Sequence, residues 1–445
     1  MTNLLEILIW TLPLEGVALF RIGGTYITLP LICCTLIVLW KTLCTLTGGM
    51  VCPLSYAGWA ACGGIIFAGL LSGLNTLRYT YDQWKWPTSI GYTILLMAFI
   101  VAVSSQRLTH TQRERLVRSQ LLVASLVALL ALYQALALNT HVLPMAILPL
   151  NNTSLAPQGM ITTSSFGGYV RPTGPFAEPS WLSHYLLLSY LVLYACGAFQ
   201  SRPRAGSRLA KWIILAGYLS ALSLGGFLLG AISALGYLCW RRWDRKSASW
   251  REVSTSRTSP TLVASGLVVI GAAVSAFWRS LASRLSLVLS SIRNFILSPS
   301  FFDVTESSVM RLSLSGAAIA VWSSSLQCIL VGVGVGQFSS AMADLTGVSF
   351  GYSGIGWLNV LAEQGVIGAL AMIVMFVWIW RREVTVHRDG ALWAAVVFAL
   401  IGAGFTGGLG FERSMKFWYF VALSLVISSQ DIAPARGSVP AEPMI

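Results

Sequence analysis

Hydrophobic residues in this chain form long runs that are separated by short clusters of basic residues. An α-helix needs about 20 consecutive apolar residues to cross a bilayer. By this criterion the pattern predicts membrane-spanning helices over 4–20, 25–44, 52–74, 88–104, 119–138, 181–199, 260–278, 354–380, 391–409 and 415–429. The predicted fold class is therefore an all-α polytopic membrane protein.

The basic clusters predict which loops face the cytoplasm. The stretches RLTHTQRERLVR, SRPRAGSRLAK, RRWDRKSASWREVSTSR and RREVTVHR hold more than half of the 29 Lys and Arg residues, and all of them lie between apolar runs. Cytoplasmic loops of membrane proteins carry this excess of positive charge. The net charge of +13 is thus explained by topology, and nucleic acid is not expected as a partner.

One apolar segment, 212–240, has basic clusters on both sides, so it must cross an even number of times. This predicts a hairpin of two short helices that turns near Leu224, Gly225 and Gly226. An arm of about 14 residues rises about 21 Å, less than the roughly 30 Å hydrocarbon core, so the turn should end in a recess. The hairpin brings the prediction to about twelve transmembrane helices with both termini in the cytoplasm.

Two long segments between the spans are predicted to be structured external loops. The stretch VMRLSLSGAAIAVWSSSLQCILVGVGVGQF in the second is apolar, but a crossing there would invert every later basic loop, so it should lie on the surface or be partly re-entrant. Its GVGVGQF end lacks the context of a nucleotide-binding loop and is predicted to be a turn. The predicted regions are N-terminal transmembrane helices (1–138), a first external loop (139–180), transmembrane helices with the hairpin 212–240 (181–278), a large external loop with surface helices (279–353), C-terminal transmembrane helices (354–429) and a cytoplasmic tail (430–445).

The stretch RPTGPFAEPSWLSHYLL, residues 171–187, sets ionisable side chains at the mouth of a predicted span. Arg171 lies in a proline-stiffened segment, and a guanidinium group matches phosphate through paired hydrogen bonds. Glu178 could be a plain helix cap or a base whose pKa is raised by reduced hydration. His184, about one and a half turns further along, could be a packing residue or the rival base.

Cations on the translocated side of a membrane protein are disfavoured, so the arginines of the two external loops require a reason. Arg171 and Arg311 are the candidates for catalysis. Arg279, Arg284 and Arg293 are candidates for substrate binding, or else they contact solvent or lipid head groups. The eight cysteines show no disulfide or zinc spacing, and we predict no metal site and no cofactor.

Four stretches, taken in order from about residue 160 to 430, resemble the O-antigen polymerase and O-antigen ligase superfamily of bacterial envelope enzymes. They are RPTGPFAEPSWLSHYL, MRLSLSGAAIAVWSSSLQCILVGVGVGQF, WLNVLAEQGVIGALAMIVMF and GFERSMKFWYFVALSLVI. Two positions depart from the family pattern. Gly354 replaces a histidine that is common in ligases, and Leu224–Gly226 replaces a Ser-Arg turn.

The resemblance implies a metal-independent glycosyltransferase on the external face of the bacterial inner membrane, with an undecaprenyl-diphosphate-linked glycan as donor. Arg171 and Arg311 match the family's diphosphate-contacting arginines, and Glu363 matches its Leu-Ala-Glu acid, which could instead cap or orient its helix. We assign Glu363 and Trp181 to substrate binding. Besides membrane lipids, the resemblance implies chain-length regulator and flippase proteins as partners.

The missing histidine favours a polymerase of lipid-linked repeat units. The alternatives are an O-antigen ligase that transfers glycan to a lipid core or other acceptor and, in a different class, a lipid-linked oligosaccharide transporter or flippase. Two ordered external loops favour an enzyme over a flippase, since a flippase needs cavities that open to both faces.

Overall fold

The computed structural model describes residues 1–22, 25–48, 55–76, 85–106, 108–140, 142–144, 165–166, 168–199, 205–247, 307–346, 355–385, 390–406 and 414–428. The helices are α1 (Thr2–Thr11), η1 (Leu12–Leu14), α2 (Leu29–Leu46), α3 (Tyr56–Thr76), α4 (Lys85–Ser104), α5 (His110–Thr140), α6 (Pro179–Ala195), α7 (Ala205–Ser220), α8 (Leu224–Ser247), α11 (Ser307–Trp322), α12 (Leu326–Val331), α13 (Phe338–Thr346), α14 (Gly356–Glu383), α15 (Gly390–Thr406) and α16 (Met415–Ser428). The strands form two antiparallel pairs, β1 (Ala18–Ile22) with β2 (Thr25–Thr28) and β3 (Ser165–Phe166) with β4 (Tyr169–Val170).

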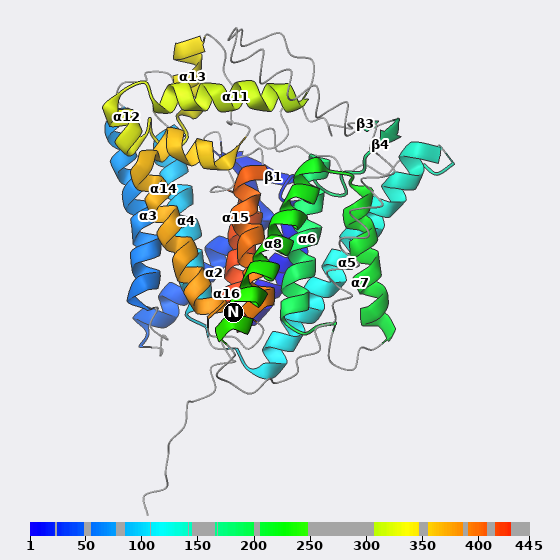
Figure 1. Cartoon of the computed structure of the whole chain (residues 1–445). Coiled ribbons are helices and arrows are strands. Elements are labelled where there is room, and N and C mark those ends of the chain that lie inside the picture. The colour runs from blue at the N-terminus through cyan, green and yellow to red at the C-terminus, as the bar shows by residue number, and fades with distance from the viewer. Residues whose placement is uncertain are drawn as a thin grey trace, which may run out of the picture.

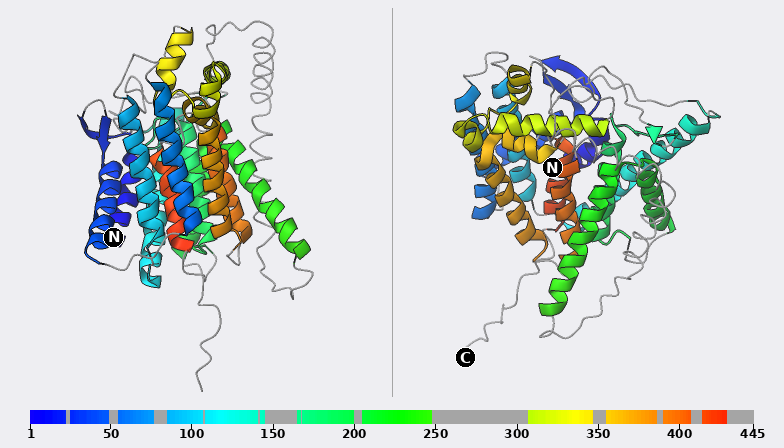
Figure 2. Two further views of the ribbon diagram at one scale, coloured as in Figure 1. Left: turned by 90° about the vertical axis from the view of Figure 1, so that its left-hand side faces the viewer. Right: turned by 45° about the horizontal axis from the view of Figure 1, so that its top comes forward.

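Most of the long helices run side by side in one bundle, and α11 lies across one end of it (Figure 1). We call this the α11 end; β1, β4 and the α7–α8 turn lie there too (Figure 1). The left view in Figure 2 shows the same bundle from the side. Among the described residues, 6 helices are long and apolar enough to span a membrane. Large hydrophobic side chains such as Leu39 and Leu43 of α2 and Phe67 of α3 are exposed on the outside. These features indicate a protein embedded in a membrane.

The first predicted span, 4–20, is not one continuous helix. Helix α1 passes into the short η1, which has Pro13 in its first turn, and the chain continues as β1. Proline lacks the N–H that would continue the hydrogen-bond ladder of the helix. Strand β2, with the sequence TYIT, consists of β-branched and aromatic residues, which favour a strand that pairs with β1. The fold is therefore mostly helical, with two small strand pairs that the all-α prediction did not include.

Segment 212–240 lies within two helices, α7 and α8, that are joined by a turn at 221–223. The turn lies just before the predicted Leu224–Gly226, where α8 already begins. The helices are 16 and 24 residues long, longer than the predicted arms, because both continue into the flanking basic clusters. Leu222 has a positive φ of 39°, a conformation that L-residues rarely adopt and that closes the tight turn.

Three short helices form the centre of the bundle. Most residues of α6, α15 and α16 are buried, and Trp418, Tyr185 and Tyr419 are among the largest side chains that are fully enclosed. Small residues allow close contact here: a Cβ added to Gly402 of α15 would lie 2.9 Å from Leu229 Cδ1 of α8. Close approach through glycine is a common way for membrane helices to pack.

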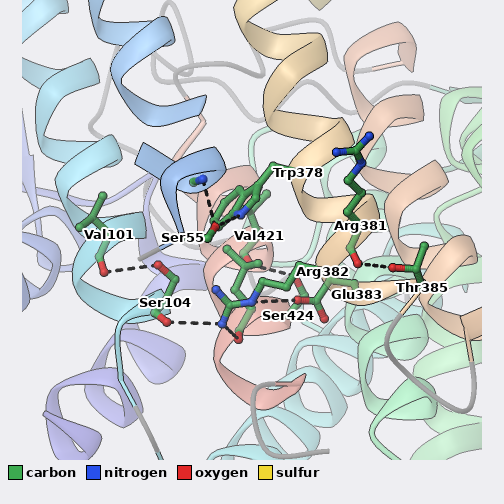
Figure 3. A network of polar contacts seen from close by, with 12 residues as sticks. Ser55, Val101, Ser104, Trp378, Arg381, Arg382, Glu383, Thr385, Val421 and Ser424 are labelled. Carbon is green, nitrogen blue, oxygen red and sulfur yellow. Dashed lines mark hydrogen bonds and ion pairs between the residues drawn. The ribbon is translucent and has the colours of Figure 1, made fainter. Parts of the chain in front are cut away.

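At the end of the bundle opposite α11, one arginine joins three helices (Figure 3). The Arg382 Nη2 atom of α14 donates to the carbonyl oxygens of Ser104 in α4, at 3.4 Å, and of Leu425 in α16, at 3.0 Å. Its Nε lies 3.6 Å from Oε1 of the fully buried Glu383. A cation at the carboxyl-terminal ends of helices is stabilised by their dipoles, so Arg382 ties α4, α14 and α16 together.

The GVGVGQF stretch is a loop, as predicted, and it packs against a break in α14. Gly365 in α14 has a φ of 63°, outside the helical range. The carbonyl oxygens of Ala362 and Glu363 accept hydrogen bonds from the N–H groups of Val333, at 2.9 Å, and Gly334, at 3.0 Å. The break thus lets α14 carbonyl groups bind the loop, and the loop places α12 and α13 against α14.

We expect Gly365→Ala to disrupt this junction. The added Cβ would lie 2.3 Å from the Leu330 carbonyl oxygen, and the backbone of Gly365, with φ 63° and ψ −163°, lies in a region used essentially only by glycine, which costs another residue about 1–3 kcal/mol. The free energy of unfolding of Gly365→Ala, measured in detergent, should fall by at least that amount. Gly63→Ala in α3 is the control, because its Cβ would meet no atom within 4 Å. Equal stability of the two variants would contradict the proposed strain at Gly365.

Candidate active site

The segment that carries Arg171 leads from β4 to the start of α6 at the α11 end of the bundle. Arg171 is half-buried, and its Nη1 donates to the carbonyl oxygen of Leu222 in the α7–α8 turn, at 3.4 Å. Tyr169, two residues earlier, donates its hydroxyl to the Ser220 carbonyl oxygen, at 3.1 Å. Both side chains therefore contact the carboxyl-terminal end of α7, where carbonyl groups and the helix dipole attract a cation.

Glu178 occupies the N-cap position of α6, with an extended backbone and Pro179 following it in the first turn. Its side chain makes no capping hydrogen bond to the backbone of α6. Instead, its Oε2 accepts a hydrogen bond from Ser180 Oγ, at 2.9 Å. Glu178 thus has the N-cap position that the cap interpretation predicts but not a capping hydrogen bond, and both the cap and the base interpretations stay hypotheses.

His184 lies further along α6, and its Nε2 is 3.0 Å from Thr406 Oγ1 at the end of α15. The Thr406 hydroxyl also donates to the Gly402 carbonyl oxygen, at 3.1 Å. A hydroxyl has one proton, so when Thr406 donates it to Gly402, the proton of a neutral His184 ring lies on Nε2. A Cβ added to Gly225, just after the α7–α8 turn, would lie 3.7 Å from His184 Nε2. His184 and Arg171 therefore approach the same turn.

Lys416 of α16 lies beside the start of α6, where it contacts a carboxylate and two aromatic rings. Lys416 Nζ of α16 lies 3.2 Å from Glu15 Oε2, 4.1 Å from the centre of the Trp181 ring and 4.7 Å from that of Phe176. The lysine side chain is 14% exposed and the glutamate 9%, so the pair is largely shielded from water. Ring faces attract cations. Trp181, predicted to bind substrate, thus contacts the chain's own cation.

Neither Lys416 nor Glu15 was selected as a site residue by sequence reasoning, although both carried a signal. Each is an ionisable residue within or beside an apolar run, and such residues in membrane proteins are usually paired or functional. Lys416 also lies inside the GFERSMKFWYF stretch that resembles the family's closing helix. What the sequence did not indicate is that residues 15, 181 and 416 meet.

Glu363, the remaining described candidate, lies in a different place from the residues at α6. It is 1% exposed in α14, and its Oε1 accepts a hydrogen bond from the backbone N–H of Phe338, at 3.4 Å. Phe338 is the first residue of α13, so the carboxylate lies at the amino-terminal end of that helix, where negative charge is stabilised. This contact favours the orienting interpretation of Glu363, applied to α13 and not to its own helix.

The structure does not describe the side chains of the other predicted arginines. Arg311 lies in the second turn of α11, which has its helical backbone described but not this side chain. Arg279, Arg284 and Arg293 lie outside the described residues. Within the described ranges, no group of three or more His, Cys, Asp and Glu residues could hold a metal ion.

Comparison with known proteins adds no relative. Neither the family models nor the curated proteins yield a match to this chain.

The Lys416–Glu15 pair predicts a large effect on stability. Lys416→Met keeps most of the length of the side chain but removes the ammonium group from a shielded carboxylate. Breaking a buried ion pair costs about 3–5 kcal/mol, and the free energy of unfolding measured in detergent should fall by about that amount. Lys416→Met combined with Glu15→Gln should recover most of the loss. A double variant as unstable as the single one would show that the ion pair is not the cause.

Proposed function

We propose that this protein is a polymerase of lipid-linked polysaccharide repeat units in a bacterial envelope, of the O-antigen polymerase and ligase type. The observation that carries the proposal is the gathering of a guanidinium (Arg171), a carboxylate (Glu178) and an imidazole (His184) at the start of α6. The first group suits a diphosphate, and the other two suit proton transfer. The four stretches that resemble the superfamily support it, and Gly354 favours polymerase over ligase.

We place the chain in the bacterial inner membrane with about twelve spans, both termini in the cytoplasm and 139–180 and 279–353 outside. Support comes from the bundle, in which α1 begins and α16 ends at the end opposite α11 (Figure 1). Arg113, Arg115 and Arg118 at the start of α5 and Arg381 and Arg382 at the end of α14 also lie toward that end. That distribution agrees with the positive-inside rule.

In the proposed reaction, a hydroxyl oxygen of the acceptor repeat unit attacks the anomeric carbon of the donor glycan. The new C–O bond forms as the bond from that carbon to the diphosphate oxygen breaks, and the electron pair leaves with undecaprenyl diphosphate. Arg171 stabilises the negative charge that develops on this leaving group. The acceptor's proton passes to Glu178 Oε or, in the rival assignment, to His184.

Arg171→Lys tests the role of the guanidinium. Purified protein in detergent, given lipid-diphosphate-linked repeat units and no nucleotide, metal or ion gradient, should lengthen them. A lysine keeps the charge but cannot form the paired hydrogen bonds, and losing a stabiliser of the developing charge costs about 10²–10³-fold in rate. Arg21→Lys is the control, since Arg21 is an exposed arginine of β1 stacked on Tyr26.

Two results would contradict the proposal in different ways. Full-length polymer from Arg171→Lys would remove the diphosphate role from this residue. A parental protein that moves the lipids across vesicles but never lengthens them would instead be a flippase.

Glu178→Gln and His184→Gln distinguish the two candidate bases. Glutamine keeps an acceptor for the Ser180 hydroxyl but cannot take the acceptor's proton, and general-base assistance contributes roughly 10²–10⁴-fold. Elongation by the Glu178 variant should fall by about that range while the carrier lipid still binds. Glu114→Gln, which alters an exposed α5 carboxylate paired with Arg118, should leave the rate unchanged. Near-parental elongation by Glu178→Gln would move the base to His184 or to an acid of the second external loop such as Glu306.

A further inference from the structure

The chain on either side of Arg171 is held by two side-chain amides of α5. We call residues 169–174 the arginine strap. Asn139 Oδ1 accepts from the Val170 N–H, at 2.8 Å, and its Nδ2 donates to the Val170 carbonyl oxygen, at 2.9 Å. One amide thus satisfies both backbone groups of the residue before Arg171, as a neighbouring strand would.

Gln134 does the same on the other side of Arg171. Its Oε1 accepts from the N–H groups of Thr173, at 3.2 Å, and Gly174, at 2.8 Å, and its Nε2 donates to the Gly174 carbonyl oxygen, at 3.1 Å. Gln134 is 3% exposed and Thr173 is 3% exposed, so these bonds form away from water. Pro172 between them has no N–H to contribute.

The opposite side of the strap contacts the end of α7. Here the strap uses its own side chains, Tyr169 to Ser220 and Arg171 to Leu222. Burial raises the pKa of Tyr169 above its ordinary value, so the phenol remains a donor at neutral and moderately alkaline pH. The strap is therefore fixed between the α5 amides and the α7 carbonyl groups, and the guanidinium of Arg171 lies on the α7 side.

We infer that Gln134 and Asn139 are positioning residues that set the place and direction of the Arg171 guanidinium. The inference rests on the proposed function, in which Arg171 binds the diphosphate. Five hydrogen bonds join the two amides to backbone groups of Val170, Thr173 and Gly174. Only Tyr169 and Val170 of the strap belong to a strand, β4, so the segment that follows them depends on side-chain partners to hold its backbone. A catalytic cation must be held closely to its productive position.

Amide hydrogen exchange tests whether Gln134 and Asn139 hold the arginine strap, without any assumption about function. In Gln134→Leu, exchange of the Thr173 and Gly174 N–H groups should rise by about tenfold, and in Asn139→Leu that of the Val170 N–H should rise similarly, because each N–H loses its side-chain acceptor. Gln120→Leu is the matched control. Gln120 is also a buried amide of α5, and its Nε2 donates to Ser189 Oγ, at 2.9 Å, at a distance from the strap along the helix. If the N–H groups of the strap exchange at the parental rate in folded Gln134→Leu and Asn139→Leu, the two amides do not hold the strap.

Elongation kinetics test the positioning role. Gln134→Leu should lower kcat by about 10²-fold, the cost of misplacing a catalytic group by about 1 Å, while Gln134→Glu, which keeps the acceptor, should lose less. Added to Arg171→Lys, Gln134→Leu should lower the rate further by less than about threefold, because residues acting as one unit are not additive. A general structural defect would multiply the two losses.

The outcomes separate the inference from the proposed function. One outcome is that the enzyme elongates and strap N–H exchange rises, but the elongation rate is unchanged or the losses from Gln134→Leu and Arg171→Lys are fully additive. This outcome would refute the positioning role and leave the polymerase proposal standing. A parental protein that neither elongates repeat units nor binds undecaprenyl diphosphate would refute the polymerase proposal. In that case the exchange experiment still decides whether the amides hold the strap.

Discussion

Backbone N–H and C=O groups that are buried among membrane helices must find hydrogen-bond partners, and the architecture of this protein depends on that constraint. A helix satisfies its own backbone, but segments that depart from helical structure need other partners. Two such described segments are the arginine strap and the loop of residues 332–337, which we call the glycine loop. The arginine strap finds its partners in Gln134 and Asn139. The glycine loop finds them in Asn75, with Nδ2 2.6 Å from the Gly332 carbonyl oxygen, and in Ser72, with Oγ 3.2 Å from the Val335 N–H.

The break in α14 meets the same constraint from the other direction. A helix interrupted at Gly365 leaves carbonyl groups that no longer bind within the helix, and the loop N–H groups of Val333 and Gly334 use them. A Cβ on Gly332 would lie 2.2 Å from the Glu363 carbonyl carbon, so the two backbones approach as closely as glycine allows. The α11–α13 layer is therefore joined to the bundle by backbone hydrogen bonds as well as by apolar packing, in which Leu314 and Ala362 take part.

Cations inside the bundle are stabilised in different ways at its two ends. Arg382 binds carbonyl groups at the ends of α4 and α16, which fits a role in holding helices together. Lys416 is held by a carboxylate and two aromatic rings beside the start of α6. Electrostatic interactions are stronger where water is excluded, because the dielectric constant is lower there. The shielded Lys416 therefore adds positive potential to the region proposed for the diphosphate. The Glu15 carboxylate offsets part of that potential and keeps the ammonium in place.

The sequence by itself determined the membrane class, the existence of most helices and the grouping of Arg171, Glu178, Trp181 and His184. Hydrophobic run length and charge position are local properties, and those four residues lie close together along one stretch of chain. The tertiary structure decided the rest. That the Glu363 carboxylate binds the start of α13 and that the Trp181 ring lies against Lys416 both depend on segments far apart in sequence. The same holds for Gln134 and Asn139, which on an apolar helix look like ordinary polar interruptions. Their contacts become visible only when the strap's backbone lies beside them, because a hydrogen-bond partner is defined by position in space and not by residue type.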